Sequence, residues 1–145
     1  MHYRPGVIKS RNIVEGALRV FEREGFSRAK VEDIAHEAGV ARTSFYFYFP
    51  TKDDVVASLM NEGEQAVLTG LREADPTTLE GFLEVLRAQL AAFWGVPARR
   101  CVLPEIFRLR IQRAAGFLTP TDDELLGLLT SHFTKAPPMS LATAS

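Results

Sequence analysis

The sequence predicts an all-α fold, and three observations support this prediction. Apolar residues between Val31 and Ala38 follow the i, i+3, i+4, i+7 spacing of an amphipathic helix. The same spacing is stronger over residues 79–94, where apolar side chains stand at relative positions 0, 3, 4, 7, 11, 14 and 15. Glycine and proline residues separate the periodic segments at places where helices usually end.

Composition and charge fit a small helical protein with a basic N-terminal part. The 145 residues are 46% hydrophobic, which is enough for a core, and the net charge is −1. Residues 1–52 hold nine Lys/Arg and six Asp/Glu, whereas residues 53–145 hold eight and twelve. The basic excess therefore lies in the N-terminal third, as electrostatic binding to nucleic acid requires.

Several protein classes are not supported by the sequence. Cys101 is the only cysteine, so no internal disulfide forms, which fits a reducing cytoplasm. No secretory signal and no apolar run of about 18 residues is present, so we expect no membrane association. His2, His36 and His132 lack metal-ligand spacing, and no nucleophile motif or phosphate loop occurs. We therefore expect no enzyme activity, no metal and no cofactor.

The first nine residues are predicted to form a flexible arm. Arg4, Lys9 and the following Arg11 would then reach neighbouring DNA phosphates, as the arms of some helix-turn-helix proteins do. A disordered terminus without such contacts is an equal alternative.

A helix is predicted from Arg11 to about Glu24, with Ser10 as its N-cap and Gly25 at its end. Its apolar residues follow helical spacing and supply one side of a three-helix core. These residues are Ile13, Ala17, Val20 and Phe21.

Two short helices with a glycine turn follow. The first runs from about Lys30 to Ala38, and Gly39 stands where a left-handed residue ends a helix. The second runs from about Arg42 to Phe49, and Pro50 stops it. This arrangement is a helix-turn-helix, whose second helix lies in the DNA major groove.

The second helix of this motif carries an unusual set of side chains. Phe45 and Phe49 are four residues apart and face the core. The hydroxyls, the arginine and the aromatic rings on the remaining surface suit phosphates, base edges and thymine methyl groups. An aromatic-rich core helix is the alternative. The predicted DNA contacts on this helix are Arg42, Thr43, Ser44, Tyr46, Phe47 and Tyr48.

Five short matches, which fall between Arg11 and Leu59, carry a family resemblance. They are Ile34-Ala35, Ala38-Gly39-Val40, Phe45-Tyr46, Tyr48-Phe49-Pro50 and Thr51-Lys52. They resemble the DNA-binding signature of the tetracycline-repressor (TetR) family. The resemblance implies a dimeric all-helical transcription regulator, with an N-terminal DNA-binding domain and a C-terminal ligand and dimerisation domain. It also implies that Lys52 contacts a DNA phosphate.

The chain departs from the family pattern at three positions. Ala29 stands where the family usually has threonine at the start of a helix, and Ala41 stands where a serine-like cap is usual. Each lost cap costs about 1 kcal/mol, although Glu32 keeps half of a capping box. Thr43 occupies a position where the family often has glycine.

A long linking helix is predicted over residues 52–73. Thr51 and Asp54 supply its capping box, and Ala74-Asp75-Pro76 ends it. The predicted regions are a DNA-binding domain over 1–52, a helical ligand and dimerisation region over 53–134, and a disordered tail over 135–145.

The next helix is predicted from Thr77 to Trp94, and its apolar stripe has two interpretations. The stripe either packs in the core or lines a pocket for a small apolar effector. The candidate pocket residues are Phe82, Leu86, Leu90, Phe93, Trp94 and Phe107.

Residues 98–118 are predicted to be helical, with Pro104 either interrupting the helix or starting a new one. Three arginines in this region either pair with acidic neighbours, bind a ligand carboxylate or face solvent. A last helix is predicted to start within residues 119–124 and to end near Phe133. The arginines are Arg108, Arg110 and Arg113.

The resemblance and the residues together predict a ligand-responsive repressor that binds palindromic operator DNA as a homodimer. Compared with the family, the chain ends early, so the C-terminal domain is expected to be short. The alternative is a truncated family member that acts as a protein-interaction module without productive DNA binding. Dimer contacts are expected from the helix beginning at Thr77, or from Phe117, Leu125, Leu126, Leu128 and Leu129.

Overall fold

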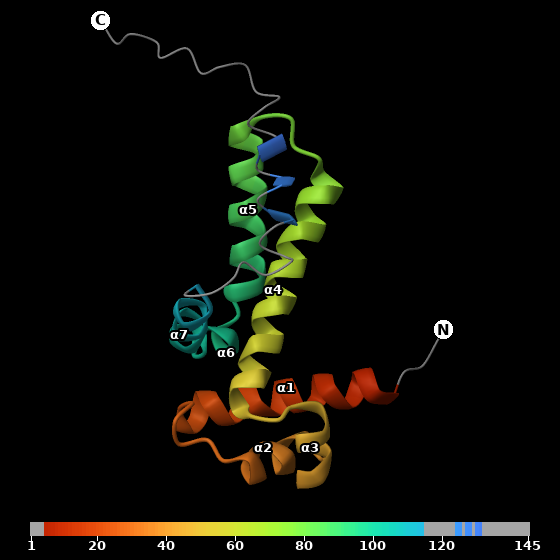
Figure 1. Cartoon of the computed structure of the whole chain (residues 1–145), viewed down its shortest axis with the longest axis vertical. Helices are drawn as coiled ribbons and strands as arrows, with labels where there is room; N and C mark the ends of the chain where they lie inside the picture. Colours follow the sequence, from red (N-terminus) through yellow and green to blue (C-terminus); the bar gives the residue numbers. More distant parts are fainter. Residues whose placement is uncertain (1–4, 115–123, 126, 129, 132–145) are drawn as a thin grey trace, which may run out of the picture.

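The computed structural model describes residues 5–114, 124, 125, 127, 128, 130 and 131. Within these residues all regular structure is helical, which confirms the predicted all-α class. The head helices are α1 (Pro5–Glu24), α2 (Val31–Ala38) and α3 (Arg42–Tyr48). The body helices are α4 (Lys52–Ala74), α5 (Leu79–Trp94), α6 (Pro97–Arg100) and α7 (Leu103–Ala114). Figure 1 shows α1, α2 and α3 forming the head at one end of the molecule, from which the long helix α4 rises.

Helix α1 begins at Pro5, so the predicted start at Arg11 is wrong. The Ser10 hydroxyl donates to the Val7 carbonyl oxygen at 2.9 Å inside the helix and does not cap its end. Proline suits the first turn of a helix because the missing N–H would have no partner there. Residues 5–9 are therefore helical, and residues 1–4 of the predicted arm lie outside the described residues.

The head is held together by apolar side chains that meet between its three helices. Helix α1 contributes the predicted stripe, which is fully or almost fully buried. Gly16 lets α2 approach α1 closely, because a Cβ atom there would lie 2.9 Å from the Ala38 backbone nitrogen. The buried head residues include Ile13, Ala17, Val20, Phe21, Ile34, Phe45 and Phe49.

The turn between α2 and α3 has the predicted form. Gly39 is left-handed at φ 67°, its N–H donates to the His36 carbonyl, and the Val40 N–H donates to the Ala35 carbonyl. Helix α3 ends one residue before the predicted boundary, with Phe49 as its C-cap. The turn fixes the angle at which α3 leaves α2.

The N-cap of α2 differs from the prediction. Lys30 occupies this position and makes no side-chain capping bond. Ala29 precedes it and is buried in the head core, so the expected cap position at Ala29 and the half capping box with Glu32 are wrong. Ala41 is the N-cap of α3 and makes no capping bond, as predicted.

Helix α4 connects the head to the body. The predicted capping box is present: the Thr51 N–H donates to Asp54 Oδ2 at 2.8 Å, and the Asp54 N–H donates to Thr51 Oγ1 at 3.3 Å. Asp75 ends the helix in the left-handed region. Helix α5 runs back alongside α4 and comes close at Gly63, where a Cβ atom would lie 2.8 Å from the Trp94 ring.

Helix α7 packs at the base of the body, next to the head (Figure 1). Pro104 lies in its first turn, which agrees with the alternative of a new helix. Val102, Ile106 and Leu109 join the head core cluster. The predicted helix extension over 115–118, most of the helix start at 119–124 and the tail over 135–145 lie outside the described residues.

Leu125 and Leu128 pack against a second buried cluster made of Val67, Leu71 and Phe82. Phe117, Leu126 and Leu129, which were predicted as dimer contacts, lie outside the described residues. None of the described helices combines the length and apolar character needed to cross a membrane.

Candidate nucleic-acid interface

Helix α3 is anchored through one face and exposed on the other. Phe45 is completely buried and Phe49 almost so, and their ring centroids lie 6.1 Å apart. Both side chains point into the head core, as predicted. The opposite face of α3 therefore lies on the molecular surface.

Arg42 and Tyr46 form one row on this exposed face. The Arg42 guanidinium carbon lies 5.6 Å from the centre of the Tyr46 ring, and Arg42 Nη1 lies 3.2 Å from Glu32 Oε1. A hydrogen bond with Tyr46 and the charge of Glu32 raise the pKa of Arg42. The row therefore presents a permanent positive charge beside a phenol ring. The ion pair with Glu32 of α2 helps to position the Arg42 side chain.

Thr43 and Phe47 form a second row, which we call the Thr43–Phe47 row. Both side chains are exposed, and Phe47 is 80% exposed. The Phe47 ring packs edge-on against Tyr48, with centroids 5.1 Å apart. This row presents a methyl group, a hydroxyl and an aromatic ring to the surroundings.

Ser44 and Tyr48 lie at the edge of the exposed face and are half-buried. Tyr48 packs against the head core. Its hydroxyl lies beside Gly6, where a Cβ atom would be 3.5 Å away. The first turns of α1 thus cover part of Tyr48, which the sequence prediction had placed fully outward.

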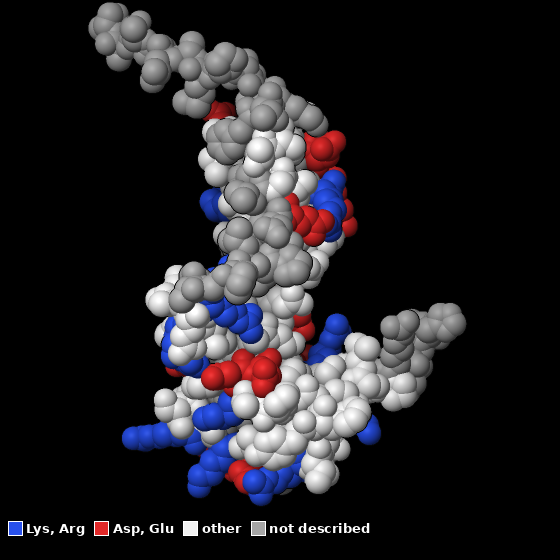
Figure 2. All heavy atoms as spheres, viewed as in Figure 1, with Lys and Arg blue, Asp and Glu red and all other residues white. Residues whose placement is uncertain are grey.

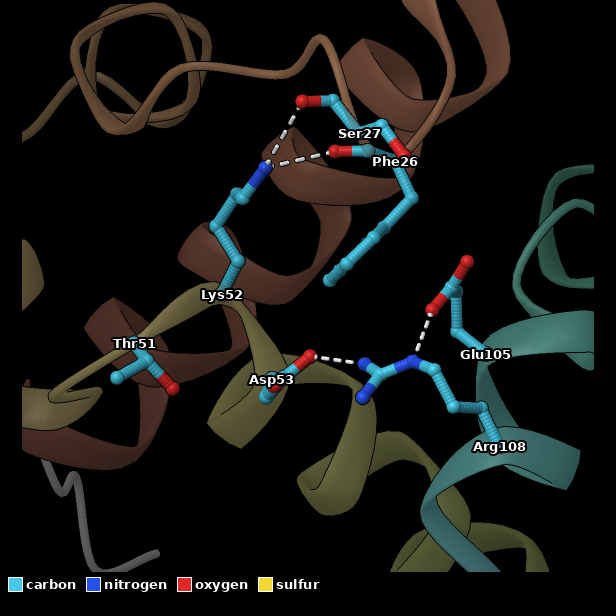
Figure 3. A pocket seen from close by; sticks show the side chains of 7 residues that line it. All are labelled: Phe26, Ser27, Thr51, Lys52, Asp53, Glu105 and Arg108. Atoms are coloured by element: carbon cyan, nitrogen blue, oxygen red, sulfur yellow. Dashed lines mark hydrogen bonds and ion pairs between the residues drawn. The ribbon is translucent and has the colours of Figure 1, made fainter.

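Lys52 is directed toward the loop after α1 (Figure 3). Its ammonium donates to the Phe26 carbonyl oxygen at 2.8 Å and lies 4.7 Å from the centre of the Phe26 ring. Ser27 supplies a second, longer contact at 3.5 Å. In this arrangement the Lys52 side chain holds the loop against the first turn of α4.

Arg108 of α7 also approaches the place where the first turn of α4 meets the loop after α1, which we call the junction (Figure 3). Its guanidinium pairs with Asp53 at 2.5 Å and with Glu105 at 2.7 Å, and lies 5.9 Å from the Phe26 ring centre. These side chains line an open cavity of about 410 Å³ between the head and α7. The junction contacts bring together charges from α4 and α7, and the sequence offered no local signal for this pairing.

Basic side chains gather at the end of the molecule that the head forms (Figure 2). Two of them are engaged, since Arg19 and Arg23 pair with Glu37 at 3.2 and 2.8 Å. These pairs lower the pKa of Glu37. Within residues 5–52, the described part of the head and the start of α4, four exposed basic residues show no ion pair: Lys9, Arg11, Arg28 and Lys30.

A separate apolar cavity of about 360 Å³ lies between α4, α5 and α7. It includes four of the six residues proposed from the sequence, namely Leu86, Leu90, Trp94 and Phe107. Phe82 is instead buried in the second cluster with Val67. Phe93 packs against Gly63, and Arg99 lies 4.1 Å above its ring.

Residues from α4 and α7, together with Leu125, complete the cavity wall, and none of them was among the pocket residues predicted from the sequence. Glu64 and Arg110 form an ion pair at this wall. The α4 residues could have been predicted from the sequence, because the apolar positions of α4 repeat at helical spacing along the side that faces α5. The additional residues are Met60, Gly63, Val67, Leu68, Leu103, Ile106 and Leu125.

Residues 13–59 match the family described as "Bacterial regulatory proteins, tetR family". The chain is 43% identical to the HTH-type transcriptional regulator EthR of Mycolicibacterium smegmatis over 49 residues, which are 34% of this chain and 23% of that protein. It is 33% identical to the HTH-type transcriptional regulator RutR of Escherichia coli O157:H7 over 125 residues, 85% of this chain and 56% of that protein.

Among solved structures, the fold is similar to that of the fatty acid degradation regulator FadR from Bacillus halodurans. The TM-score is 0.59 at 25% identity, and the match covers 93% of this chain and 70% of that chain. The chain spans between about a quarter and just over half of the two curated relatives above. The family match over residues 13–59 includes most of α1, all of α2 and α3, and the first turns of α4.

Proposed function

Because this chain belongs to the tetR family of bacterial regulatory proteins, we propose that it is a transcriptional regulator that inserts α3 into the major groove of operator DNA. Members of this family are DNA-binding transcription factors and not enzymes. One observation carries the proposal: Phe45 and Phe49 anchor α3, while Arg42, Tyr46 and Phe47 face outward. An exposed helix face with this composition suits base edges and phosphates.

The residues of the interface have different roles in this proposal. Arg42, Thr43, Tyr46 and Phe47 meet the DNA directly. Ser44 and Tyr48 lie at the edge of the contact, and Lys52 supports the loop that positions the head. The unpaired basic residues of α1 and of the segment before α2 face the flanking phosphates, which gives the binding its dependence on salt.

The proposal includes a homodimer in the cytoplasm that represses transcription. One head buries little DNA surface, whereas two heads one helical turn apart, about 34 Å, combine their binding energies on a palindromic site. Leu83 and Leu90 of α5 and Ile111 of α7 are exposed apolar residues that suit a contact with a second copy.

The proposed effector site is the apolar cavity between α4, α5 and α7. A small apolar molecule fits its 360 Å³ and its wall of Leu86, Leu90, Trp94 and Phe107. Such a molecule releases DNA only to the extent that it binds more tightly to the conformation with low DNA affinity. Helix α4 runs from this cavity to the head, so a shift of α4 moves α3.

The DNA-binding proposal is tested by fluorescence anisotropy of the purified chain on duplexes taken from the region beside its own gene. We expect binding that weakens steeply between 50 and 200 mM salt, a range over which several phosphate contacts lose orders of magnitude in affinity. Arg42→Ala should weaken binding by about fivefold or more. Arg113→Ala, an exposed arginine of α7, is the control and should bind like the unchanged chain. Absence of salt-sensitive binding would contradict the proposal.

The effector proposal can be tested by intrinsic fluorescence, because Trp94 is the only tryptophan in the chain and lines the cavity. Small apolar compounds that enter the cavity should change Trp94 emission and release bound DNA at the same concentrations. Compounds that release DNA without any change in Trp94 emission would argue against this site.

A protein-interaction module without productive DNA binding is the second candidate. The exposed apolar residues Leu83, Leu90 and Ile111 favour it, since they suit a helical partner as well as a second copy. Analytical ultracentrifugation separates the two: a stable dimer supports the operator-binding homodimer, whereas a monomer that binds no DNA supports the module.

A further inference from the structure

Phe47 projects from α3 and contributes little to the folded core. Its side chain is 80% exposed, the largest fraction among the exposed large hydrophobic residues of the described chain. It does not belong to the head core, although its helix neighbours Phe45 and Phe49 do. Keeping an aromatic ring in water gives up hydrophobic free energy, so a position like this suits a ring that a partner covers.

The neighbours of Phe47 divide the exposed face of α3 by chemistry. Arg42 and Tyr46 interact with each other, and Arg42 also pairs with Glu32. Thr43 stands one helical turn before Phe47 and is exposed like it. One row is therefore cationic and polar, and the other presents a methyl group and an aromatic ring, with one hydroxyl.

We infer that the Thr43–Phe47 row recognises thymine methyl groups in the major groove, an inference that rests on the DNA-binding function proposed above. The 5-methyl group of thymine is the one apolar group among the base edges of this groove, and Phe and the Thr methyl group are suited to contact it. Amino groups and carbonyl oxygens of the other base edges would lose water against the Phe47 ring without gaining a hydrogen bond.

The spacing of the row fits neighbouring bases. Residues four apart on a helix are separated by about 6 Å along its axis. This distance is close to two base-pair steps of about 3.4 Å each. The half-site is therefore expected to hold a thymine opposite Phe47, with a second thymine within two base pairs opposite Thr43.

The test begins with selection of duplexes from a random library by the purified full chain. Each thymine of the enriched half-site is then replaced singly by deoxyuridine, which keeps the hydrogen-bonding groups and lacks only the 5-methyl group. We expect binding to weaken about three- to tenfold at one or two positions and to stay unchanged at the others. Phe47→Ala should weaken binding to the thymine duplex and should be insensitive to deoxyuridine at the position opposite Phe47.

Val96→Ala is the matched control, because Val96 is an apolar residue, 42% exposed, that precedes α6 outside the helix-turn-helix and has no role in the proposed binding. It should keep the full sensitivity to deoxyuridine, and circular dichroism should show that both variants keep the helical fold. Equal deoxyuridine sensitivity in the unchanged chain and in Phe47→Ala would overturn the inference, as would no sensitivity at any thymine. If the selection enriches no duplex, the proposed DNA-binding function fails, and the inference fails with it.

Discussion

At the scale of single residues, α3 begins at a position without a capping side chain. Ala41 has the extended backbone of an N-cap, with φ −71° and ψ 152°, and makes no capping bond. Ala41→Ser should supply a hydroxyl for the free N–H groups of α3 and raise the free energy of unfolding by about 1 kcal/mol. Urea unfolding followed by circular dichroism measures this change.

The control is the opposite change, Thr51→Ala, which removes the N-cap side chain that is present at the start of α4. Thr51 accepts a hydrogen bond from the Asp54 N–H, so its loss should cost about 1 kcal/mol. Ala41→Ser without any gain, alongside a clear loss in Thr51→Ala, would mean that the start of α3 is satisfied by water as well as by a hydroxyl.

Some residue-scale features that depend on local chemistry were predictable from the sequence, although the caps expected at Ser10 and Ala29 were wrong. The Thr51–Asp54 capping box and the uncapped Ala41 involve neighbours in the chain, and the structure has both. The difference in exposure between Phe47 and Tyr48 was not predictable. It arises because α1 begins at Pro5 and its first turns reach Tyr48, a contact between residues far apart in sequence.

At the scale of helices, α1 and α2 approach each other closely at Gly16. A Cβ atom there would lie 2.9 Å from the Ala38 backbone nitrogen, and a backbone atom cannot rotate away. Gly16→Ala should therefore destabilise the chain by about 1–3 kcal/mol, although alanine normally favours a helix. Thermal unfolding measures the effect.

Gly6→Ala is the matched control on the same helix. The nearest atom to its new Cβ would be the Tyr48 hydroxyl at 3.5 Å, which is an ordinary contact. This variant should be neutral or slightly more stable. Equal effects of the two substitutions would mean that the spacing of α1 and α2 adjusts more freely than the structure indicates.

The ion pairs between α1 and α2 give the head a dependence on pH. Hydrogen bonds from Arg23 and Arg19 lower the pKa of Glu37. A lowered pKa contributes stability that is present above the ordinary glutamate pKa, about 4.3, and is lost as pH falls through the lowered value. The unchanged chain should therefore be more stable than Glu37→Gln at pH 7, and their stabilities should converge below about pH 4.

Thermal unfolding between pH 3 and pH 7 checks this expectation. The control is Glu15→Gln, since Glu15 is an exposed residue of α1 without an ion pair in the described part of the chain. The difference in stability between Glu15→Gln and the unchanged chain should stay nearly constant between pH 3 and pH 7. A constant difference in stability between the unchanged chain and Glu37→Gln at every pH would contradict a stabilising role of the ion pairs with Glu37.

Helices as elements were predictable because apolar spacing and breaking residues are local signals. The neighbours of each helix were not. The stripe of α5 has one periodicity, yet Phe82 joins a cluster with Val67, Phe93 packs on Gly63, and Leu86 and Leu90 line the cavity. The apolar spacing predicts that one face of α5 is buried. Which residue each position contacts depends on how α4 and α7 pack against that face.

At the scale of the whole molecule, the head and the body meet through the junction of α4, α7 and the loop after α1. Phe26 belongs to the loop and lies near both Lys52 and Arg108. Arg108 also reaches Asp53 at the first turn of α4. Since α7 contributes to the apolar cavity through Phe107 and to this junction through Arg108, one helix touches both regions.

Arg108→Gln should loosen α7 from the head without unfolding the core, because Ile106 and Leu109 remain buried. Amide hydrogen exchange of α7 is expected to rise about two- to fivefold, as for loss of partly exposed ion pairs, while exchange in α5 stays constant. The increase should shrink at 1 M salt, which screens the pairs in the unchanged chain. Arg113→Gln on the same helix is the control and should exchange like the unchanged chain. If Arg108→Gln and Arg113→Gln behave alike, apolar packing alone holds α7 against the head, and the proposed effector response would have to act through α4.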